Sequence, residues 1–110
     1  MKGERMKLIY VAGKYRGKGE SEVFDNIVHA RSVAIKLWQR GWAVICPHTN
    51  SIFMGSRISD DDYIKGDLEI VSRCDAIYML SGWQKSVGAK EELVKAIALA
   101  LEIYYEENND

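Results

Sequence analysis

The chain lacks several features that define whole classes of protein. Its 110 residues carry a net charge of −1, so no strongly basic surface points to a nucleic-acid polymer as partner. No apolar run is long enough to be a secretory signal or to cross a membrane, because the longest early one covers only residues 8–12. Cysteine is scarce too, with only Cys46 and Cys74. These absences favour a reduced, cytosolic protein with no membrane partner.

A metal centre or a cofactor is not expected either. Zinc sites in proteins are built from cysteine and histidine ligands at characteristic spacings. The two cysteines lack that spacing, and Cys46-Pro47-His48 would supply only half of such a site. Because the whole chain has two cysteines and two histidines, roles in the core and in loops are favoured for them.

The order of apolar runs and helical patterns predicts a single α/β domain over residues 1–110. Continuous apolar runs, typical of parallel strands buried on both faces, occupy residues 8–12, 42–46 and 75–80, with residues 103–105 as a possible fourth strand. Helical patterns occupy residues 21–40, 60–72 and about 88–101. This alternation predicts a mainly parallel sheet of four or five strands in a three-layer sandwich. Residues 106–110 are expected to form a frayed tail.

Helical spacing predicts which faces of the helices are buried. The predicted apolar stripe of the first helix is Phe24, Ile27, Val28, Ala34, Leu37 and Trp38. The predicted stripe of the last helix is Ala89, Leu93, Ala96, Ile97, Ala100 and Leu101. In the middle helix, N-cap chemistry is supplied by Asp60, Asp61 and Asp62.

Two adjacent glutamates of the last helix differ in their position on this pattern. Glu91 lines up with Lys95 and Glu102 on the solvated side, whereas Glu92 lies at the edge of the apolar stripe. Acids in the first turn of a helix stabilise its dipole, which accounts well for Glu91. For Glu92, that role and a role toward a ligand are both open, because ligands of open α/β sheets gather at the carboxyl ends of strands.

Glycines and cations follow the first predicted strand, in Gly13-Lys14-Tyr15-Arg16-Gly17-Lys18-Gly19. The segment is neither a Walker loop nor a dinucleotide-binding fingerprint, because its glycines and lysines are misplaced for both. Glycines still let backbone amides approach a phosphate, and Lys14 and Arg16 supply positive charge. An anion-binding loop and an ordinary polar turn both fit this pattern.

Two further polar side chains fall within apolar patterns. Asp67 lies on the apolar stripe of the middle helix, between Ile64 and Val71, where a carboxylate must be paired, hydrogen-bonded or functional. Tyr10 is central in the first strand, and its hydroxyl needs a partner if it is buried. A structural carboxylate and plain core packing are the alternatives. Together with Glu92 and the loop, these residues describe a pocket with two carboxylates, a phenol and an anion-binding segment.

Three motifs resemble those of the nucleoside 2-deoxyribosyltransferase superfamily. They are Tyr10-Val-Ala-Gly13-Lys-Tyr-Arg16-Gly17, the helix of Asp67 leading to Cys74-Asp75-Ala76, and Ser86-x-Gly88-x-x-x-Glu92. Within that superfamily, the functional parallel is the branch of nucleoside 5′-monophosphate N-glycosidases. Pro47-His48, Gly82-Trp83 and Ser86-x-Gly88-Ala89 also resemble a group of small uncharacterised proteins placed in the superfamily. The resemblance spans about residues 7–105 and implies a flavodoxin-like fold, with dimers that complete each other's sites.

The resemblance also implies roles for individual residues. Glu92 matches the catalytic glutamate, Asp67 an active-site aspartate and Tyr10 the tyrosine that orients the glutamate. The phosphate-side positions are matched by Gly13, Arg16, Gly17 and Ser86, with Lys14 and Gly88 as neighbouring candidates.

The implied chemistry is cleavage of the N-glycosidic bond of a nucleoside or nucleoside 5′-monophosphate. Glu92 would be the nucleophile, and Asp67 would protonate or orient the base. Water as acceptor gives hydrolysis, and a second base gives transfer. A nucleotide-binding sensor that keeps the phosphate loop without turnover is the alternative, and an interaction protein without a ligand is a third.

Two expectations concern the surroundings of this pocket. Residues 48–59 form a long connection with little pattern after the second strand, and we expect a lid there, with Phe53 or Met54 available to cover an apolar base. A symmetric homo-oligomer, most simply a dimer, is expected because large apolar side chains exceed what a chain of this size can hide. Those side chains are Trp38, Trp42 and Trp83, together with those of the apolar final helix.

Overall fold

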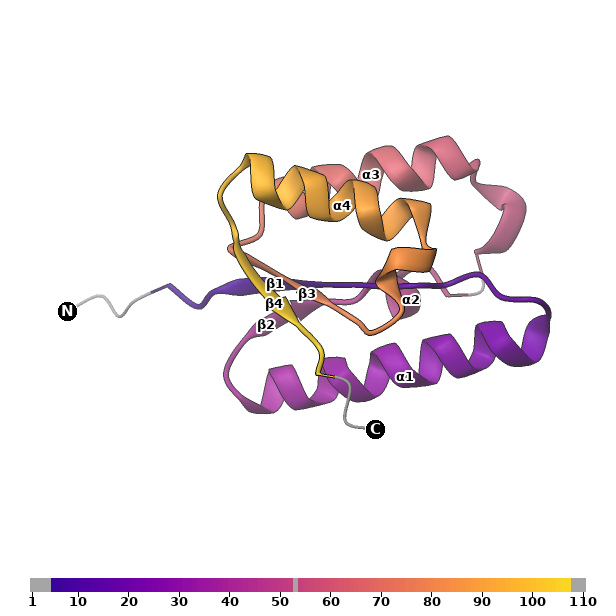
Figure 1. Cartoon of the computed structure of the whole chain (residues 1–110), viewed down its shortest axis with the longest axis horizontal. Coiled ribbons are helices and arrows are strands. Elements are labelled where there is room, and N and C mark those ends of the chain that lie inside the picture. Colours follow the sequence, from indigo (N-terminus) through magenta and orange to yellow (C-terminus); the bar gives the residue numbers. More distant parts are fainter. Residues whose placement is uncertain (1–4, 53, 108–110) are drawn as a thin grey trace.

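The structure is a computed structural model that describes residues 5–52 and 54–107 (Figure 1). Its centre is a parallel sheet of four strands in the order β2-β1-β3-β4. The strands are β1 (Leu8–Ala12), β2 (Ala43–Ile45), β3 (Ala76–Met79) and β4 (Glu102–Tyr105). The predicted parallel sheet and its fourth strand are therefore confirmed, and β2 and β3 are one residue shorter at each end than predicted.

Helices cover both faces of the sheet, as the three-layer prediction requires. Helix α1 (Glu20–Gln39) lies against one face, while α3 (Asp60–Ser72) and α4 (Val87–Ala98) lie side by side on the other (Figure 1). The short helix α2 (Pro47–Asn50) follows β2, and single 3₁₀ turns form at Gly55–Arg57 and Trp83–Lys85. No helix of the described residues is long and apolar enough to cross a membrane.

Strand β1 carries the centre of the core, because it lies between β2 and β3 and is covered by helices on both sides. Its side chains alternate between the two faces, as the strand period requires. Ile9 and Val11 pack on the side of α1, while Tyr10 and Ala12 pack on the side of α3 and α4. The sheet therefore directs Tyr10 toward the helices that carry Asp67 and Glu92. The cysteines have the predicted core roles, since both are buried and free.

The predicted stripe of α1 is wrong at two positions. Phe24 and Trp38 are 64% and 55% exposed. The buried face consists of Ala30, Val33, Ala34 and Leu37. Trp38 directly follows the buried Leu37, so it lies off the buried face of the helix. At Phe24, near the other end, length explains the difference: a helix of 20 residues extends about 30 Å, whereas a five-residue strand extends about 17 Å. Only part of α1 can therefore lie over the sheet.

Helix α4 is shorter than predicted and buries a different set of residues. It ends at Ala98, and Ala100 has the left-handed φ of 60° in the turn to β4. Ile97, placed on the predicted stripe, is 57% exposed. The buried positions of α4 are Ala89, Glu92, Leu93 and Ala96.

The start of α3 and the beginning of the predicted tail differ from the predictions. The N-cap of α3 is Ser59, whose Oγ accepts the N–H of Asp62 at 3.1 Å, so the three aspartates form the first helical turn instead. Glu106 does not belong to a frayed tail, because its N–H donates to the Met79 carbonyl at 2.9 Å. Its carboxylate also accepts the Ser81 N–H at 2.8 Å. Residues 108–110 lie outside the described part of the chain.

Candidate functional site

The strand order creates a topological switch point at the carboxyl ends of β1 and β3, and we use the word crevice for this edge of the sheet. The connection that leaves β1 runs to α1 on one face, and the connection that leaves β3 runs to α4 on the other. In open α/β sheets, ligands bind where neighbouring connections diverge in this way. The two segments that border the crevice are the β1–α1 loop (residues 13–19) and the β3–α4 turn (residues 80–86).

A buried hydrogen bond joins α4 to β1 beneath this crevice. The hydroxyl of Tyr10 donates to Oε2 of Glu92 at 2.7 Å. Glu92 is only 9% exposed, whereas its neighbour Glu91 is exposed. The sequence prediction that separated the two glutamates is therefore confirmed in its geometry, and the buried hydroxyl of Tyr10 has the partner that it needs.

Burial changes the protonation of this group of side chains. Burial, reinforced by the charges of Asp67 and Glu91, raises the pKa of Glu92 to about 8, although the Tyr10 hydrogen bond opposes the shift. Burial also raises the pKa of Asp67 to about 6. The pKa of Tyr10 is raised well above its usual value, first by burial and then by Glu92. The phenol therefore keeps its proton and donates a hydrogen bond to the carboxyl group of Glu92.

The β1–α1 loop is held by side chains of α1 and α3. Nζ of Lys14 donates to Glu22 of α1 at 2.7 Å, and Arg16 forms an ion pair with Asp60 of α3. Nδ2 of Asn26, also on α1, donates to the carbonyls of Tyr15 at 3.0 Å and Arg16 at 3.4 Å. The two cations predicted to meet an anion are thus paired with carboxylates in this structure.

The candidate glycines of the site have different reasons for being glycine. A Cβ on Gly13 would lie 2.6 Å from Cδ1 of Leu80, and a Cβ on Gly17 would lie 2.5 Å from Cβ of Glu22. Gly13 therefore permits close packing of the loop against the β3–α4 turn, and Gly17 permits close packing against α1. A Cβ on Gly88, at the start of α4, would make only an ordinary contact, with Oγ of Ser86 at 3.9 Å. Ser86 caps α4, with its Oγ accepting the N–H of Ala89 at 3.1 Å.

His48 is the residue of this region that sequence reasoning missed. It lies in α2, is 3% exposed, and its Nε2 is 2.9 Å from the carbonyl oxygen of Lys14. Its ring also lies 5.8 Å from that of Tyr15, centroid to centroid. The signal that could have found it is its position directly after Pro47, at the carboxyl end of β2. Within residues 5–52 and 54–107, no group of three or more histidine, cysteine, aspartate or glutamate side chains is arranged to hold a metal ion.

The segment predicted as a lid begins at the same edge of the sheet, since α2 opens it and contacts the β1–α1 loop through His48. Met54 is 43% exposed. Tyr63 of α3 holds the middle of the segment, because its hydroxyl donates to the Gly55 carbonyl at 2.9 Å. Phe53 lies outside the described residues.

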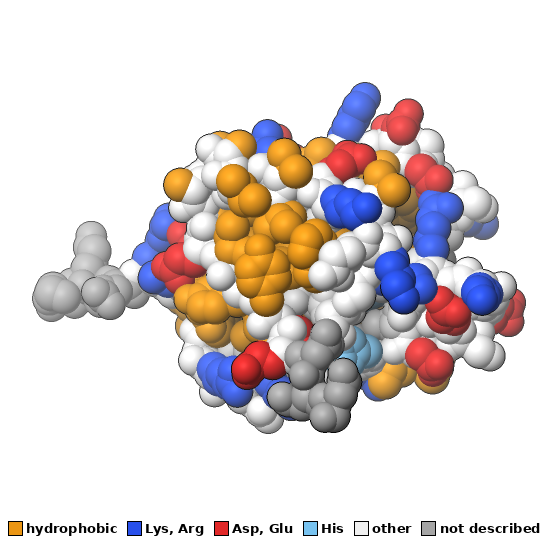
Figure 2. Space-filling model, in the orientation of Figure 1, with side chains coloured by type: hydrophobic (Ala, Val, Ile, Leu, Met, Phe, Trp, Pro, Cys, Tyr) orange, Lys and Arg blue, Asp and Glu red, His pale blue; other side chains and the backbone are white. Residues whose placement is uncertain are grey.

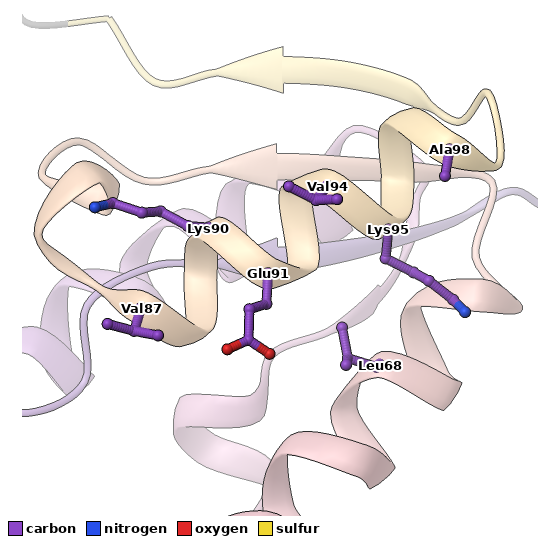
Figure 3. Close-up of a pocket in the computed structure, with 7 residues that line it drawn as sticks. All are labelled: Leu68, Val87, Lys90, Glu91, Val94, Lys95 and Ala98. Atoms are coloured by element: carbon purple, nitrogen blue, oxygen red, sulfur yellow. The ribbon is translucent and has the colours of Figure 1, made fainter.

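Two surface hollows lie beside the site, and among the described residues Glu92 lines neither of them. The larger, of about 450 Å³, is a groove between α3 and α4 (Figure 3). It is lined by Leu68, Val87, Lys90, Glu91, Val94, Lys95 and Ala98. Glu91 and Lys95 point from α4 toward α3 here, so the groove belongs to the outer side of α4 (Figure 3). The smaller, of about 380 Å³, lies at the β3–α4 turn beside Tyr105 and Glu106.

The strand order and the crevice define a flavodoxin-like α/β protein. The chain belongs to the family described as a domain of unknown function, DUF4406, which matches residues 7–105. A solved structure of 2-deoxyribosyltransferase from the psychrotolerant bacterium Bacillus psychrosaccharolyticus has a similar fold, with a TM-score of 0.64 and 22% identity over 93% of this chain and 77% of that chain. At this identity the likeness concerns the fold. No curated protein matches the sequence.

Proposed function

We propose that this protein cleaves the N-glycosidic bond of a nucleoside or nucleoside 5′-monophosphate. The observation that carries the proposal is the buried pair of Glu92 and Tyr10, with Asp67 close enough for its charge to act on Glu92, at the crevice between β1 and β3. Two carboxyl groups with displaced pKa values are what acid-assisted glycosidic cleavage requires. The fold shared with a 2-deoxyribosyltransferase supports the same class of substrate.

In the proposed reaction, a carboxylate oxygen of Glu92 attacks C1′ of the sugar. The bond from C1′ to the base nitrogen breaks, and its electron pair leaves with the base, which takes a proton from Asp67. Tyr10 holds Glu92 in position by its hydrogen bond. Water, activated by the ionised Asp67, then attacks C1′ and releases the sugar and Glu92. If a second base attacks instead, the same intermediate gives base transfer.

The two pKa values require a proton to move before attack. With Glu92 near 8 and Asp67 near 6, a neutral solution holds the proton on Glu92 and leaves Asp67 ionised. The reactive form has the opposite distribution. Positive charge that develops at C1′ favours ionised Glu92, so substrate binding shifts the proton toward the group that protonates the base.

The phosphate of a monophosphate substrate would bind at the edge formed by the β1–α1 loop and the start of α4. The candidates for this contact are Gly13, Lys14, Arg16, Gly17, Ser86 and Gly88. Lys14 and Arg16 are paired with the carboxylates of Glu22 and Asp60. A bound phosphate would take the place of these carboxylates as the anionic partner of the two cations.

A panel of nucleosides and nucleoside 5′-monophosphates tests the proposal. Each is incubated with the protein, with and without an acceptor base, and free base is measured by chromatography. Release of free base without an acceptor supports hydrolysis, and a new nucleoside with an acceptor supports transfer. If no member of the panel releases base under either condition, the proposed activity is wrong.

A nucleotide-binding module without turnover is the second candidate. It is favoured by one observation, namely that Glu92 is buried and lines neither surface hollow. A melting temperature that rises with a monophosphate, together with no release of base, would support this module instead of the enzyme.

We also propose that the protein forms a symmetric dimer through the groove between α3 and α4. Val87 and Val94 are 71% and 66% exposed there, and Ile97 beside them is 57% exposed. Lys90, Glu91 and Lys95 place charges of both signs around this apolar surface. A two-fold axis would bring opposite charges of two copies together, as an isologous interface requires.

A further inference from the structure

We propose that His48 is a positioning residue that orients the backbone of the β1–α1 loop for binding a phosphate group. The inference rests on the proposed function for the identity of the phosphate-bearing substrate. It adds that backbone N–H groups, held by His48 and Asn26, make the contact, in place of the side chains of Lys14 and Arg16 alone.

The first step is the hydrogen bond between α2 and the loop. Nε2 of His48 is 2.9 Å from the carbonyl oxygen of Lys14, and a carbonyl only accepts, so Nε2 carries the hydrogen. Burial lowers the pKa of His48, which favours the neutral ring, and the contact with the Lys14 carbonyl selects the tautomer with hydrogen on Nε2. Nδ1 is then an acceptor, and it has no hydrogen-bond partner among the described residues.

The second step is the direction of the peptide groups. In a trans peptide, the C=O and the following N–H point in opposite directions, and the described backbone contains no cis bond. His48 holds the carbonyl of Lys14, so the N–H of Tyr15 is turned away from α2. Asn26 holds the next two carbonyls, so the N–H groups of Arg16 and Gly17 are turned away from α1.

The third step is what these three N–H groups do. Within the described residues, none of them donates a hydrogen bond to the protein. Successive backbone N–H groups without internal partners can bind an anion together where the backbone turns them to one side. The side chains of Lys14 and Arg16 are meanwhile held by carboxylates. The loop therefore offers three backbone donors whose directions depend on His48 and Asn26.

Glutamine and asparagine provide matched variants of His48. The amide nitrogen of glutamine lies near the position of Nε2, so His48→Gln keeps a donor for the Lys14 carbonyl. The amide nitrogen of asparagine lies near Nδ1, so His48→Asn loses that donor while keeping an amide. His48→Leu removes both polar atoms, and His29→Leu removes the other histidine of the chain as a control.

The readout is the amide NMR spectrum of the full chain during a titration with inorganic phosphate. We expect the amide resonances of Tyr15, Arg16 and Gly17 to shift in the wild type. We expect phosphate affinity to fall about tenfold in His48→Asn and His48→Leu, the equivalent of one hydrogen bond. In His48→Gln and His29→Leu it should change by less than about threefold. If His48→Leu fails to fold, the phosphate affinities of His48→Gln and His48→Asn alone decide whether the donor at Nε2 matters.

Three outcomes overturn the inference: no shift of these amides in the wild type, equal affinities in the glutamine and asparagine variants, or an equal loss in His29→Leu. Kinetics provide a second readout where the protein is active. His48→Asn should raise KM for a nucleoside monophosphate and leave KM for the matching nucleoside unchanged. A protein that binds phosphate through these amides but releases no base from any nucleotide would contradict the proposed function and leave the role of His48 standing.

Discussion

Glu92 and Glu91 occupy consecutive positions on one turn of α4, and both experience nearly the same helix dipole. Only Glu92 accepts the hydrogen bond of Tyr10 and is buried. We expect Glu92→Gln to abolish release of base, because an amide can neither attack C1′ nor stabilise its positive charge. Binding of a nucleoside monophosphate should survive, since the phosphate contacts lie on the β1–α1 loop. Chromatography of free base and a binding titration measure the two effects.

Glu91→Gln is the matched control for this substitution. Its side chain points into the exposed groove, so its removal should leave both turnover and binding nearly unchanged (Figure 3). An inactive Glu91→Gln variant beside an active Glu92→Gln variant would reverse the assignment of the nucleophile.

The raised pKa of Glu92 also predicts how stability depends on pH. An acid whose pKa rises from 4.5 in the unfolded chain to about 8 in the folded protein holds its proton more tightly when folded. The wild type therefore loses free energy of unfolding as pH rises from 4.5 to about 8, by at most about 1.4 kcal/mol per pH unit. Glu92→Gln has no such loss.

Urea unfolding of the wild type and Glu92→Gln at pH 5 and pH 8.5 measures this difference. We expect the variant to gain stability relative to the wild type at the higher pH, because both proteins share every other titrating group. A difference between the two proteins that is the same at both pH values would show that Glu92 is not desolvated in the folded state.

At the scale of the elements, the β1–α1 loop and the start of α4 respond oppositely to the same substitution. Gly13→Ala would bring a Cβ to 2.6 Å from Leu80, so we expect a loss of about 1–3 kcal/mol in the free energy of unfolding. Gly88→Ala adds a Cβ in a helix at an ordinary contact distance of 3.9 Å from Oγ of Ser86, so we expect a gain of up to about 1 kcal/mol. Urea unfolding measures both, and a Gly13→Ala variant as stable as the wild type would contradict the packing against Leu80.

The strands were predictable from the sequence because β1 and β3 are buried on both faces and so read as continuous apolar runs. The ends of the helices were less predictable. Ala100 takes the left-handed φ of 60° that glycine usually supplies, so no glycine marked the end of α4. The error at Phe24 arose because helical spacing carries no information on how far α1 extends beyond the sheet. The error at Trp38 arose because the predicted stripe held two adjacent residues, of which only Leu37 is buried.

The candidate site likewise has a part that could be predicted from the sequence and a part that could not. The helix period placed Glu92 at the edge of the apolar stripe of α4, whereas the pairing of Glu92 with Tyr10 was implied only by the resemblance to the nucleoside 2-deoxyribosyltransferase superfamily. His48, Asn26, Glu22 and Asp60 hold a loop whose backbone has no repeating pattern. Such contacts depend on how three helices converge on one loop, and no spacing along the chain encodes that.

At the scale of the whole molecule, apolar side chains gather on the surface. Figure 2 shows such a patch in the middle of one face, over β4 and the adjoining part of α4. Tyr104 and Tyr105 of β4 are 41% and 53% exposed. Trp42 and Trp83, expected at an interface, are half-buried and lie 5.8 and 6.1 Å from Tyr104 and Tyr105, ring centroid to ring centroid. Trp42 and Trp83 are thus partly covered, whereas Trp38 of α1, the third tryptophan expected at an interface, is 55% exposed.

Light scattering of two matched variants tests the proposed dimer. Val94 lies in the groove of α4, and Phe24 is similarly exposed on α1, on the opposite face of the sheet. We expect Val94→Asp to convert a dimer into a monomer, because a buried unpaired carboxylate is costly at an interface. Phe24→Asp should leave the dimer intact. A monomeric wild type, or a dimer that survives Val94→Asp, would rule out this interface.

The direction of β1 has a practical consequence for assays of this protein. Leu8 begins β1 at the amino ends of the strands, and the crevice lies at the other end, about 17 Å away for a strand of five residues. Glu106 is instead bound to Ser81 beside the crevice. An affinity tag on the amino-terminal side is therefore attached through the end of β1 that is opposite the candidate site, whereas a tag on the carboxyl-terminal side is attached through Glu106, which lies beside the site.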